Sequence, residues 1–283
     1  MKYTIRIGVL VWAMVAAGTT VLAQSRPLAT EDPETVPAGN ILFEAGFDFE
    51  HGAFFPASGL SGNLTRIGTF GFSFGISPIA EIQLDGGLHN RLSITSAVPA
   101  PLSSMLVLTG VSSGDAQDAS IGTKVRFLAE TASRPAMAVR FWTRLPNAGN
   151  ESGLGLDTTD FHFGISAAKT IQSIRVVGNF GFGILPDPVR GDRQNDVVDI
   201  GVSVARAVRP GIELVGELNG RISTRNGTAP IGTDSLGAMR LGARATRGPI
   251  RIDGALMIGV TERDPSWGFT TGVTWVFKAF EVK

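Results

Sequence analysis

The residues best suited to catalysis are a histidine and an aspartate two positions apart, His162 and Asp160. A hydrolase acting on lipids would need serine, histidine and an acid within reach of one another and of the membrane. The local alternation puts His162 and Asp160 on the polar face of their segment, and no serine nucleophile stands out beside them. His51 and His89 lack the spacing of metal ligands. We therefore predict no catalytic residue, no metal site and no cofactor.

Charged and polar side chains instead recur on one face of many short segments. We expect the members of this set to line an internal space: Glu44, Glu81, Asp85, Lys124, Arg126, Arg140, Arg144, Asp160, His162, Arg175, Asn179, Glu213, Glu217, Arg221, Arg240 and Arg251. Such a set can create a transverse field that selects solutes. It can also form ion pairs that stiffen the wall, and the two roles are compatible.

The elements that carry these side chains are predicted to be twelve β-strands. In 119–130, Ile121, Val125 and Phe127 alternate with Lys124 and Arg126, the period-two pattern of an extended strand with two different faces. Equivalent patterns occupy 41–50, 63–75, 79–91, 135–145, 158–170, 173–184, 196–206, 211–223, 236–245, 249–261 and 267–279. Most run about ten to thirteen residues, longer than average strands of soluble proteins and long enough to cross a membrane with tilt.

The connections between these segments alternate in length. Short ones follow even-numbered segments, whereas long ones, at 51–62, 92–115, 146–157, 185–195 and 224–235, mostly follow odd-numbered ones. This alternation is typical of membrane barrels with tight periplasmic turns and larger external loops. The predicted fold is all-β: a twelve-stranded antiparallel up-and-down transmembrane β-barrel with both termini in the periplasm.

The apolar faces indicate which side meets lipid. On 63–75 we assign Leu64 and Phe70 to the apolar face, and across all segments the charged exceptions on that face are Arg66, Lys169 and Arg206. All three lie near predicted strand ends, where long side chains can reach the membrane surface. The alternative is a secreted β-sandwich, which would bury the apolar faces and expose the charges.

Three regions follow from the composition along the chain. Residues 1–23 resemble a signal peptide, with Lys2 and Arg6 before an apolar run that ends in small residues. The alternative for this run is a membrane anchor. Residues 24–39 are rich in proline and acid and are expected to form a periplasmic arm, and 40–283 the barrel. The zero net charge argues against a nucleic-acid partner, and the absence of cysteine excludes disulfides.

Several motifs resemble a known family of outer-membrane transporters, that of the meta-pathway of phenol degradation. The motifs are "SSGDAQDASIGTKVRF", "AMAVRFWTRLPNAGNESGLGLDTTDFHFG", "IRVVGNFGFGI", "VARAVRPGIELVGELNGR" and "FTTGVTWVF", between residues 112 and 277. In the second, Asn147 and Ala148 depart from the family's usual "LPTG". The family is distantly related to the long-chain fatty acid channel. The resemblance implies passive uptake of small, often hydrophobic or aromatic, molecules, with outer-membrane lipid, a small permeant and the outer-membrane assembly machinery as partners.

Two further features bear on this function. The apolar stretch 97–111 is expected either to form an apolar entry patch or lid for a hydrophobic permeant or to pack on itself at the barrel mouth. By resemblance to the fatty acid channels, Gly86 and Gly87 could kink a strand and open the wall laterally. Ordinary packing of small residues is the alternative. Two other functions remain open, a structural or adhesive barrel with a closed lumen and a barrel lipid hydrolase.

Overall fold

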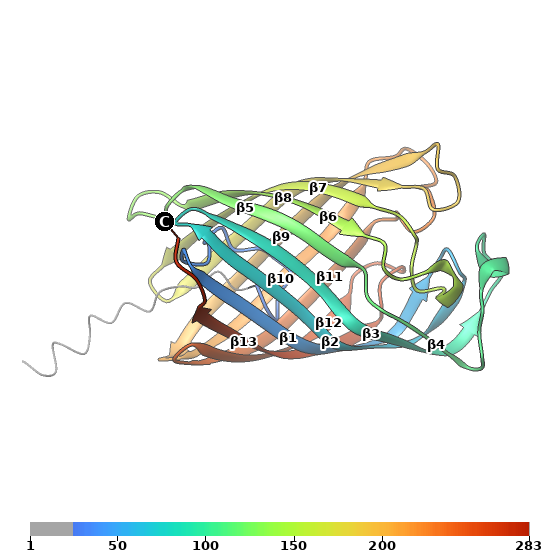
Figure 1. Ribbon diagram of the computed structural model, residues 1–283, viewed down its shortest axis with the longest axis horizontal. Helices are drawn as coiled ribbons and strands as arrows, with labels where there is room; N and C mark the ends of the chain where they lie inside the picture. Colours follow the sequence, from blue (N-terminus) through green and yellow to red (C-terminus); the bar gives the residue numbers. More distant parts are fainter. Residues whose placement is uncertain (1–24, 283) are drawn as a thin grey trace, which may run out of the picture.

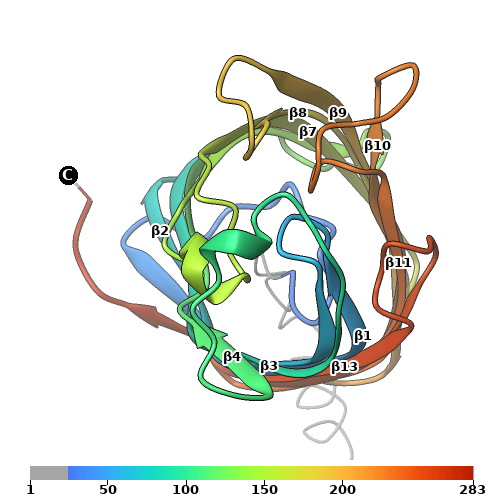
Figure 2. The ribbon, with the colours of Figure 1, turned by 90° about the vertical axis from the view of Figure 1, so that its right-hand side faces the viewer.

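The computed structural model describes residues 25–282 and forms a closed antiparallel β-barrel (Figures 1 and 2). Its twelve barrel strands are β1 (Asn40–Phe55), β2 (Leu60–Ser77), β3 (Ala80–Ala97), β5 (Ala119–Leu128), β6 (Ala136–Leu145), β7 (Asp160–Ile171), β8 (Ile174–Pro186), β9 (Gln194–Arg209), β10 (Ile212–Ser223), β11 (Leu236–Arg247), β12 (Ile250–Gly259) and β13 (Trp267–Lys278). Each pairs with its sequence neighbour, and β1 pairs with β13 to close the ring. The predicted twelve-stranded fold is confirmed.

The short turns, the start of β1 and the end of β13 lie at one end of the barrel. Asn40 at the start of β1 pairs with Lys278 at the end of β13, and Figure 1 shows the C-terminus at this end. The long connections lie at the other end, called here the loop end. No helix among residues 25–282 is long and apolar enough to span a membrane. The predicted signal peptide, 1–23, lies outside the described residues.

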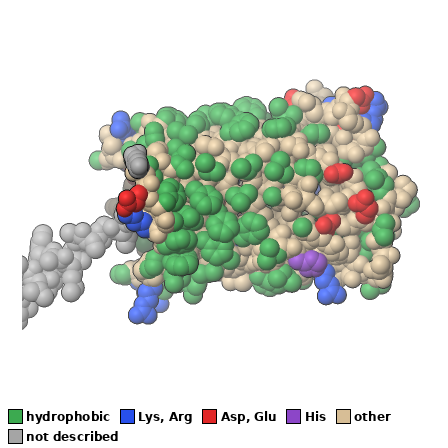
Figure 3. All heavy atoms as spheres, in the orientation of Figure 1, with side chains coloured by type: hydrophobic (Ala, Val, Ile, Leu, Met, Phe, Trp, Pro, Cys, Tyr) green, Lys and Arg blue, Asp and Glu red, His purple; other side chains and the backbone are tan. Residues whose placement is uncertain are grey.

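The strands expose apolar side chains outward and bury charged ones inside. Phe182 and Leu256 are 53% and 65% exposed, whereas Glu81 and Lys124 are 0% and 1% exposed. Figure 3 shows hydrophobic side chains spread over the wall, with charged ones gathered at its two ends. The predicted orientation of the two faces is therefore correct, and the β-sandwich alternative is wrong because no second sheet covers the apolar face of residues 25–282.

The first three barrel strands are longer than predicted, at 16, 18 and 18 residues. Consequently the predicted external loop 51–62 shrinks to a turn at 56–59, and 92–115 contains the end of β3, the 3₁₀ helix η1 (Ser103–Met105) and the short strand β4 (Ser112–Asp115). The extensions hold together because Ala53, Leu60, Leu64 and Leu92 form a buried apolar cluster near the loop end. β4 pairs with β3 beyond the end of β5.

A bulge at Gly68 changes which side chains of β2 point inward. The β1–β2 register shifts at Gly46/Phe47, and Gly68 has a φ of +67°, a conformation that glycine adopts without strain. One added residue reverses the alternation, so Leu64 is buried inside the barrel. Arg66 also lies inside, where it forms an ion pair with Glu50. The assignments of Leu64 and Arg66 to the lipid-facing side were wrong for this reason.

Candidate functional site: the barrel lumen

Residues 25–37, called here the inner segment, run inside the barrel rather than away from it. Figure 2, viewed from the loop end, shows this dark blue stretch within the ring of strands. Val36 is fully buried and packs with Leu42 and Val276. The pyrrolidine rings of its three prolines restrict the segment's backbone, so holding it in one path costs less conformational entropy.

Acidic side chains of the inner segment bind basic side chains of the wall. Glu31 accepts a hydrogen bond of 2.7 Å from Lys124 Nζ on β5. Asp32 accepts two from Arg175 on β8, at 2.6 and 2.7 Å, in the bidentate arrangement that suits guanidinium and carboxylate. Further contacts of the same kind join Glu34 to Arg126. These pairs provide the compensation that buried charges require.

Polar side chains of the wall also bind the backbone of the inner segment. Glu217 on β10 accepts hydrogen bonds from the amides of Ala29 and Thr30, at 2.8 and 2.7 Å. Glu81 on β3 accepts one from the Val36 amide at 2.6 Å. Asn179 on β8 accepts a hydrogen bond from the Glu31 amide at 2.7 Å and donates one to the Glu31 carbonyl at 2.8 Å. The segment is therefore held along its length by side chains from widely separated strands.

The structure thus brings seven of the sixteen predicted residues onto one segment: Glu81, Lys124, Arg126, Arg140, Arg175, Asn179 and Glu217. Most of the others interact with neighbouring side chains inside the barrel. Arg144 binds Asp160, Arg240 binds Glu217, Arg251 lies 3.8 Å from Glu213, Asp85 lies 3.7 Å from Arg140, and Glu44 accepts from Thr274 at 3.3 Å. Arg221 donates to two backbone carbonyls.

The residues missed at the sequence level include three acidic residues of the inner segment. Glu31, Asp32 and Glu34 belong to the acidic run "EDPE", which is typical of a solvated linker. Their partners Lys124 and Arg126 lie more than 90 positions away in sequence. The useful signal was the pair of basic residues on the predicted inner face of 119–130, which required acidic partners.

The Glu31 carboxylate stays ionised in this environment. Burial raises its pKa, but the nearby positive charges of Lys124 and Arg140 outweigh burial and hold the pKa at about 2. Gln83 adds a hydrogen bond of 3.0 Å to the same carboxylate. At neutral pH, Glu31 is therefore a fixed negative charge within the lumen.

His162 lies between two side chains that explain its position. Its ring stacks on Trp142 with a centroid distance of 4.8 Å and an interplanar angle of 6°. Its Nδ1 lies 2.8 Å from the Asp199 carboxylate. Among residues 25–282 the hydrogen bonds of the His162 side chain do not include a serine, so the hydrolase arrangement is not assembled around it. Within the same residues, no group of three His, Cys, Asp or Glu side chains is placed to hold a metal.

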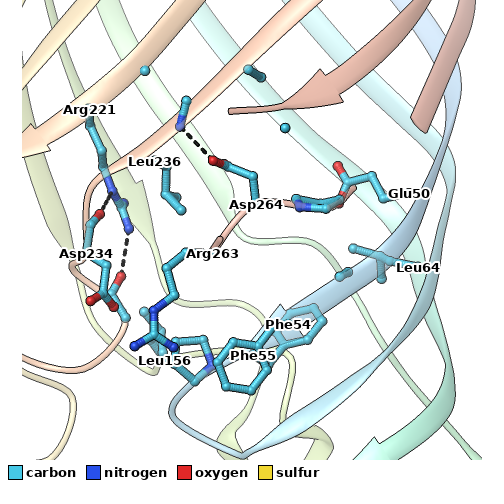
Figure 4. Close-up of a pocket in the computed structure, with 18 of the residues that line it drawn as sticks. Glu50, Phe54, Phe55, Leu64, Leu156, Arg221, Asp234, Leu236, Arg263 and Asp264 are labelled. Carbon is cyan, nitrogen blue, oxygen red and sulfur yellow. Dashed lines mark hydrogen bonds between the residues drawn. The ribbon is translucent and has the colours of Figure 1, made fainter. Parts of the chain in front are cut away.

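Two cavities extend from the loop end to the inner segment. The outer cavity, about 590 Å³, is lined by Phe54, Phe55 and Leu156 together with Arg221 and Arg263 (Figure 4). The inner cavity, about 310 Å³, is bounded by Ala29, Thr30 and Glu31 of the inner segment. Both share Asn219, Gly220, Arg221 and Leu236 in their linings, so a solute in the outer cavity lies next to the inner one.

The apolar stretch 97–111 is divided between the two arrangements expected for it. Leu102 is buried, and Leu106 packs against the apolar cluster of Leu60 and its neighbours. Val107 and Val111, by contrast, are 71% and 82% exposed. Leu102 and Leu106 therefore pack on the barrel mouth, whereas most of the stretch remains exposed at the surface.

The interruption beside Gly86 and Gly87 is a further feature of the wall. The β3–β5 ladder ends at the pair Asp85–Ser120, and the β3–β4 ladder begins only at Asn90–Asp115. Between them, the Gln117 amide donates to the Gly87 carbonyl at 3.1 Å. We call this interruption, 86–89 against 116–118, the seam. The inward alternation of β3 changes just after Gly87, because Gly87 and Asn90 are both buried.

The overall architecture matches that of known outer-membrane proteins. The COG4313 outer membrane channel from Pseudomonas putida F1 aligns with a TM-score of 0.61 and 13% identity over 87% of this chain and 98% of that one. The chain has the fold of an outer-membrane channel. The resemblance noted from the sequence motifs is thereby confirmed at the level of the fold.

Other solved barrels align less closely. The NanC porin gives a TM-score of 0.49 with 9% identity, over 85% of this chain and 99% of that one. The toluene transporter TodX from Pseudomonas putida gives 0.40 with 11% identity, over 87% and 90%. The sequence matches no protein-family model and no curated protein.

Proposed function

We propose that this protein is an outer-membrane channel for passive uptake of small hydrophobic or aromatic molecules. The observation that carries the proposal is the pair of adjoining cavities leading from the loop end to the inner segment, inside a wall whose outer face is apolar. In this proposal 1–23 directs export, the outer-membrane assembly machinery inserts 40–283, and the inner segment is the periplasmic arm folded back into the lumen.

The chemistry of the lumen supports a small and partly apolar permeant. Phe54, Phe55 and Leu156 line the outer cavity, so an apolar solute can leave water on reaching it. The inner segment occupies the lumen below, which leaves little room for a large hydrated solute. The fold alone does not choose the permeant, because one barrel architecture serves many functions.

Uptake by whole cells tests this proposal. Bacteria with a lipopolysaccharide-containing outer membrane that produce the protein should accumulate radiolabelled toluene faster than cells carrying the empty vector. A hydrophilic trisaccharide should enter both at the same rate. Equal toluene accumulation in the two strains, with the barrel folded in the outer membrane, would contradict the proposal and favour the closed structural barrel.

We further propose that apolar solutes leave the lumen sideways through the seam. Its closure depends on few contacts: one backbone hydrogen bond from Gln117, whose side-chain oxygen is buried without a hydrogen-bond partner among the described residues. Leu88, at the lipid side of the seam, is 72% exposed. The glycines also allow the close approach of Gln117, because a Cβ on Gly87 would lie 2.4 Å from its Oε1.

An engineered disulfide tests the seam directly, since the protein contains no cysteine. A Cβ placed on Gly87 would lie 3.1 Å from Gln117 Cβ, slightly closer than the usual disulfide distance of about 3.8 Å. We expect the oxidised double variant Gly87→Cys/Gln117→Cys to lose toluene uptake and to recover it on reduction. Each single cysteine variant serves as control. Full uptake by the oxidised protein would show that the seam is only a packing feature.

A further inference from the structure

The inner cavity has one wall without side chains. Gly164 on β7 and Gly181 on β8 are direct cross-strand partners, and Gly201 on β9 lies one strand further on; all three are buried on the inner face. Gly201 lies between Asn179 and Asn219, two residues from the partner of Gly181, and a Cβ there would lie 3.1 Å from Thr30 Oγ1. The shallow recess is therefore formed by the peptide groups at Gly164 and Gly181.

An aromatic stack borders the recess. The Arg140 guanidinium carbon lies 4.6 Å from the centre of the Trp142 ring, on which His162 also stacks. The edge of the same indole overlies Gly164, since a Cβ there would lie 3.5 and 3.7 Å from its Cζ3 and Cη2 atoms. These contacts fix the indole in one orientation, so it presents a rigid apolar edge to the cavity.

Among the charged side chains around the recess, Arg221 has hydrogen-bond donors that remain available for a ligand. Glu31 is bound by Lys124, and Asp199 is in contact with His162. Arg221 donates through Nε and Nη2 to the carbonyls of Asp234 and Gly232, at 2.9 and 2.8 Å, and has no carboxylate within 4.0 Å among residues 25–282. The two carbonyls hold the guanidinium in place, and its Nη1 donors remain for a ligand.

A second polar group at the recess also has unused bonding capacity. Ser166, which lines the inner cavity, is 5% exposed, and its hydroxyl has no hydrogen-bond partner among the described residues. Buried polar atoms are normally paired, so an unpaired one in a cavity indicates a ligand or water position. Ser166 and Arg221 both line the inner cavity, and Arg221 faces the outer cavity as well.

From this arrangement we propose that the inner cavity is a binding site for single-ring aromatic acids. The ring lies against the backbone at Gly181 and beside the Trp142 edge that covers Gly164, and the carboxylate faces Arg221 at the junction of the two cavities. A cavity of about 310 Å³ is ample for one substituted ring, because a 150 Å³ cavity already holds benzene. This inference rests on the proposed function, in which the site binds the permeant along the uptake path.

Benzoate binding to the purified full-length protein in a non-ionic detergent tests the site. Titration calorimetry should give saturable binding to the wild type. Cyclohexanecarboxylate should bind more weakly, because its puckered ring cannot lie flat against the glycine wall. The variant Gly164→Val should weaken benzoate binding at least tenfold, since its side chain occupies the recess. Gly178→Val is the matched control, because a Cβ at Gly178 meets no atom within 4 Å.

A second variant tests the contribution of the Arg221 charge separately from the shape of the recess. Arg221→Gln should weaken benzoate binding about tenfold, the loss expected for one charge-assisted hydrogen bond, and leave benzyl alcohol binding within about twofold. Arg263→Gln, which removes an exposed arginine of the outer cavity, should change neither. A parallel loss for both ligands in Arg221→Gln would overturn the assignment of the carboxylate to this residue.

These measurements distinguish a failure of the proposed binding site from a failure of the proposed channel function. Absence of benzoate binding, or unchanged binding in Gly164→Val, overturns the site even where cells still take up toluene. Saturable binding that Gly164→Val abolishes supports the site even where uptake fails, and then only the transport proposal is lost. Circular dichroism of each variant establishes that the barrel is folded.

Discussion

Replacing Lys124 with methionine should loosen the inner segment around Glu31 and destabilise the protein by about 3–5 kcal/mol, the cost typical of breaking a buried ion pair. Lys124 is 1% exposed and lies 2.7 Å from Glu31 and 3.0 Å from Glu81. It also donates to the Asp32 carbonyl at 3.0 Å. Methionine fills a similar volume but leaves two buried carboxylates without their shared cation. Urea-induced unfolding from lipid vesicles measures the free energy of unfolding. Planar-bilayer recording measures whether the conductance through the lumen increases.

The controls for Lys124→Met come from the same chain. Lys169→Met removes a lysine that binds backbone carbonyls of the turn at 131–134 and has no hydrogen bond or ion pair with the inner segment among the described residues, so it should cost little. Adding Glu31→Gln to Lys124→Met should recover part of the stability, because one uncompensated carboxylate is then neutral. A stability and conductance indistinguishable from those of Lys169→Met would contradict the role assigned to Lys124.

Deleting residues 25–37 should open the lumen and make it anion-selective. Barrels of eight strands are filled by their own side chains, whereas those of sixteen leave a water channel, so a twelve-stranded barrel has room for an internal segment. The deletion removes Glu31, Asp32 and Glu34 but only one basic residue, Arg26. Lys124, Arg126 and Arg175 then face water without these partners. Larger single-channel conductance and a reversal potential shifted toward chloride are the expected readouts.

Removing the charges of the basic side chains on the barrel wall provides the control for this deletion. In the deletion protein, replacing Lys124, Arg126 and Arg175 with glutamine should remove the anion preference while the large conductance persists. A deletion protein that conducts no better than the full chain would mean that the wall side chains alone close the lumen. The inner segment would then be a stabilising element and not the obstruction.

The extent of sequence-based prediction differs between the wall and the lumen. All twelve barrel strands followed from alternation, and so did the orientation of the faces along ten of them, because side chains in a strand point to opposite sides whatever surrounds them. β2 and β3 were the exceptions. A single added residue near Gly68 and Leu88 reverses the alternation, and glycine can take the required positive φ without any sign of it in the pattern. Leu64 and Arg66 were misplaced for that reason.

The apolar exterior and the ionic interior of the membrane barrel can be read from the amino-acid pattern, since that information is local and repeated along the chain. The contents of the ionic interior depend on how the strands close into a ring. Residues 31–34 are a polar linker by composition, yet they lie among Lys124, Arg126 and Arg175. Closure of the sheet brings distant strands around one axis, and electrostatic pairing across that axis depends on distances that sequence separation does not encode.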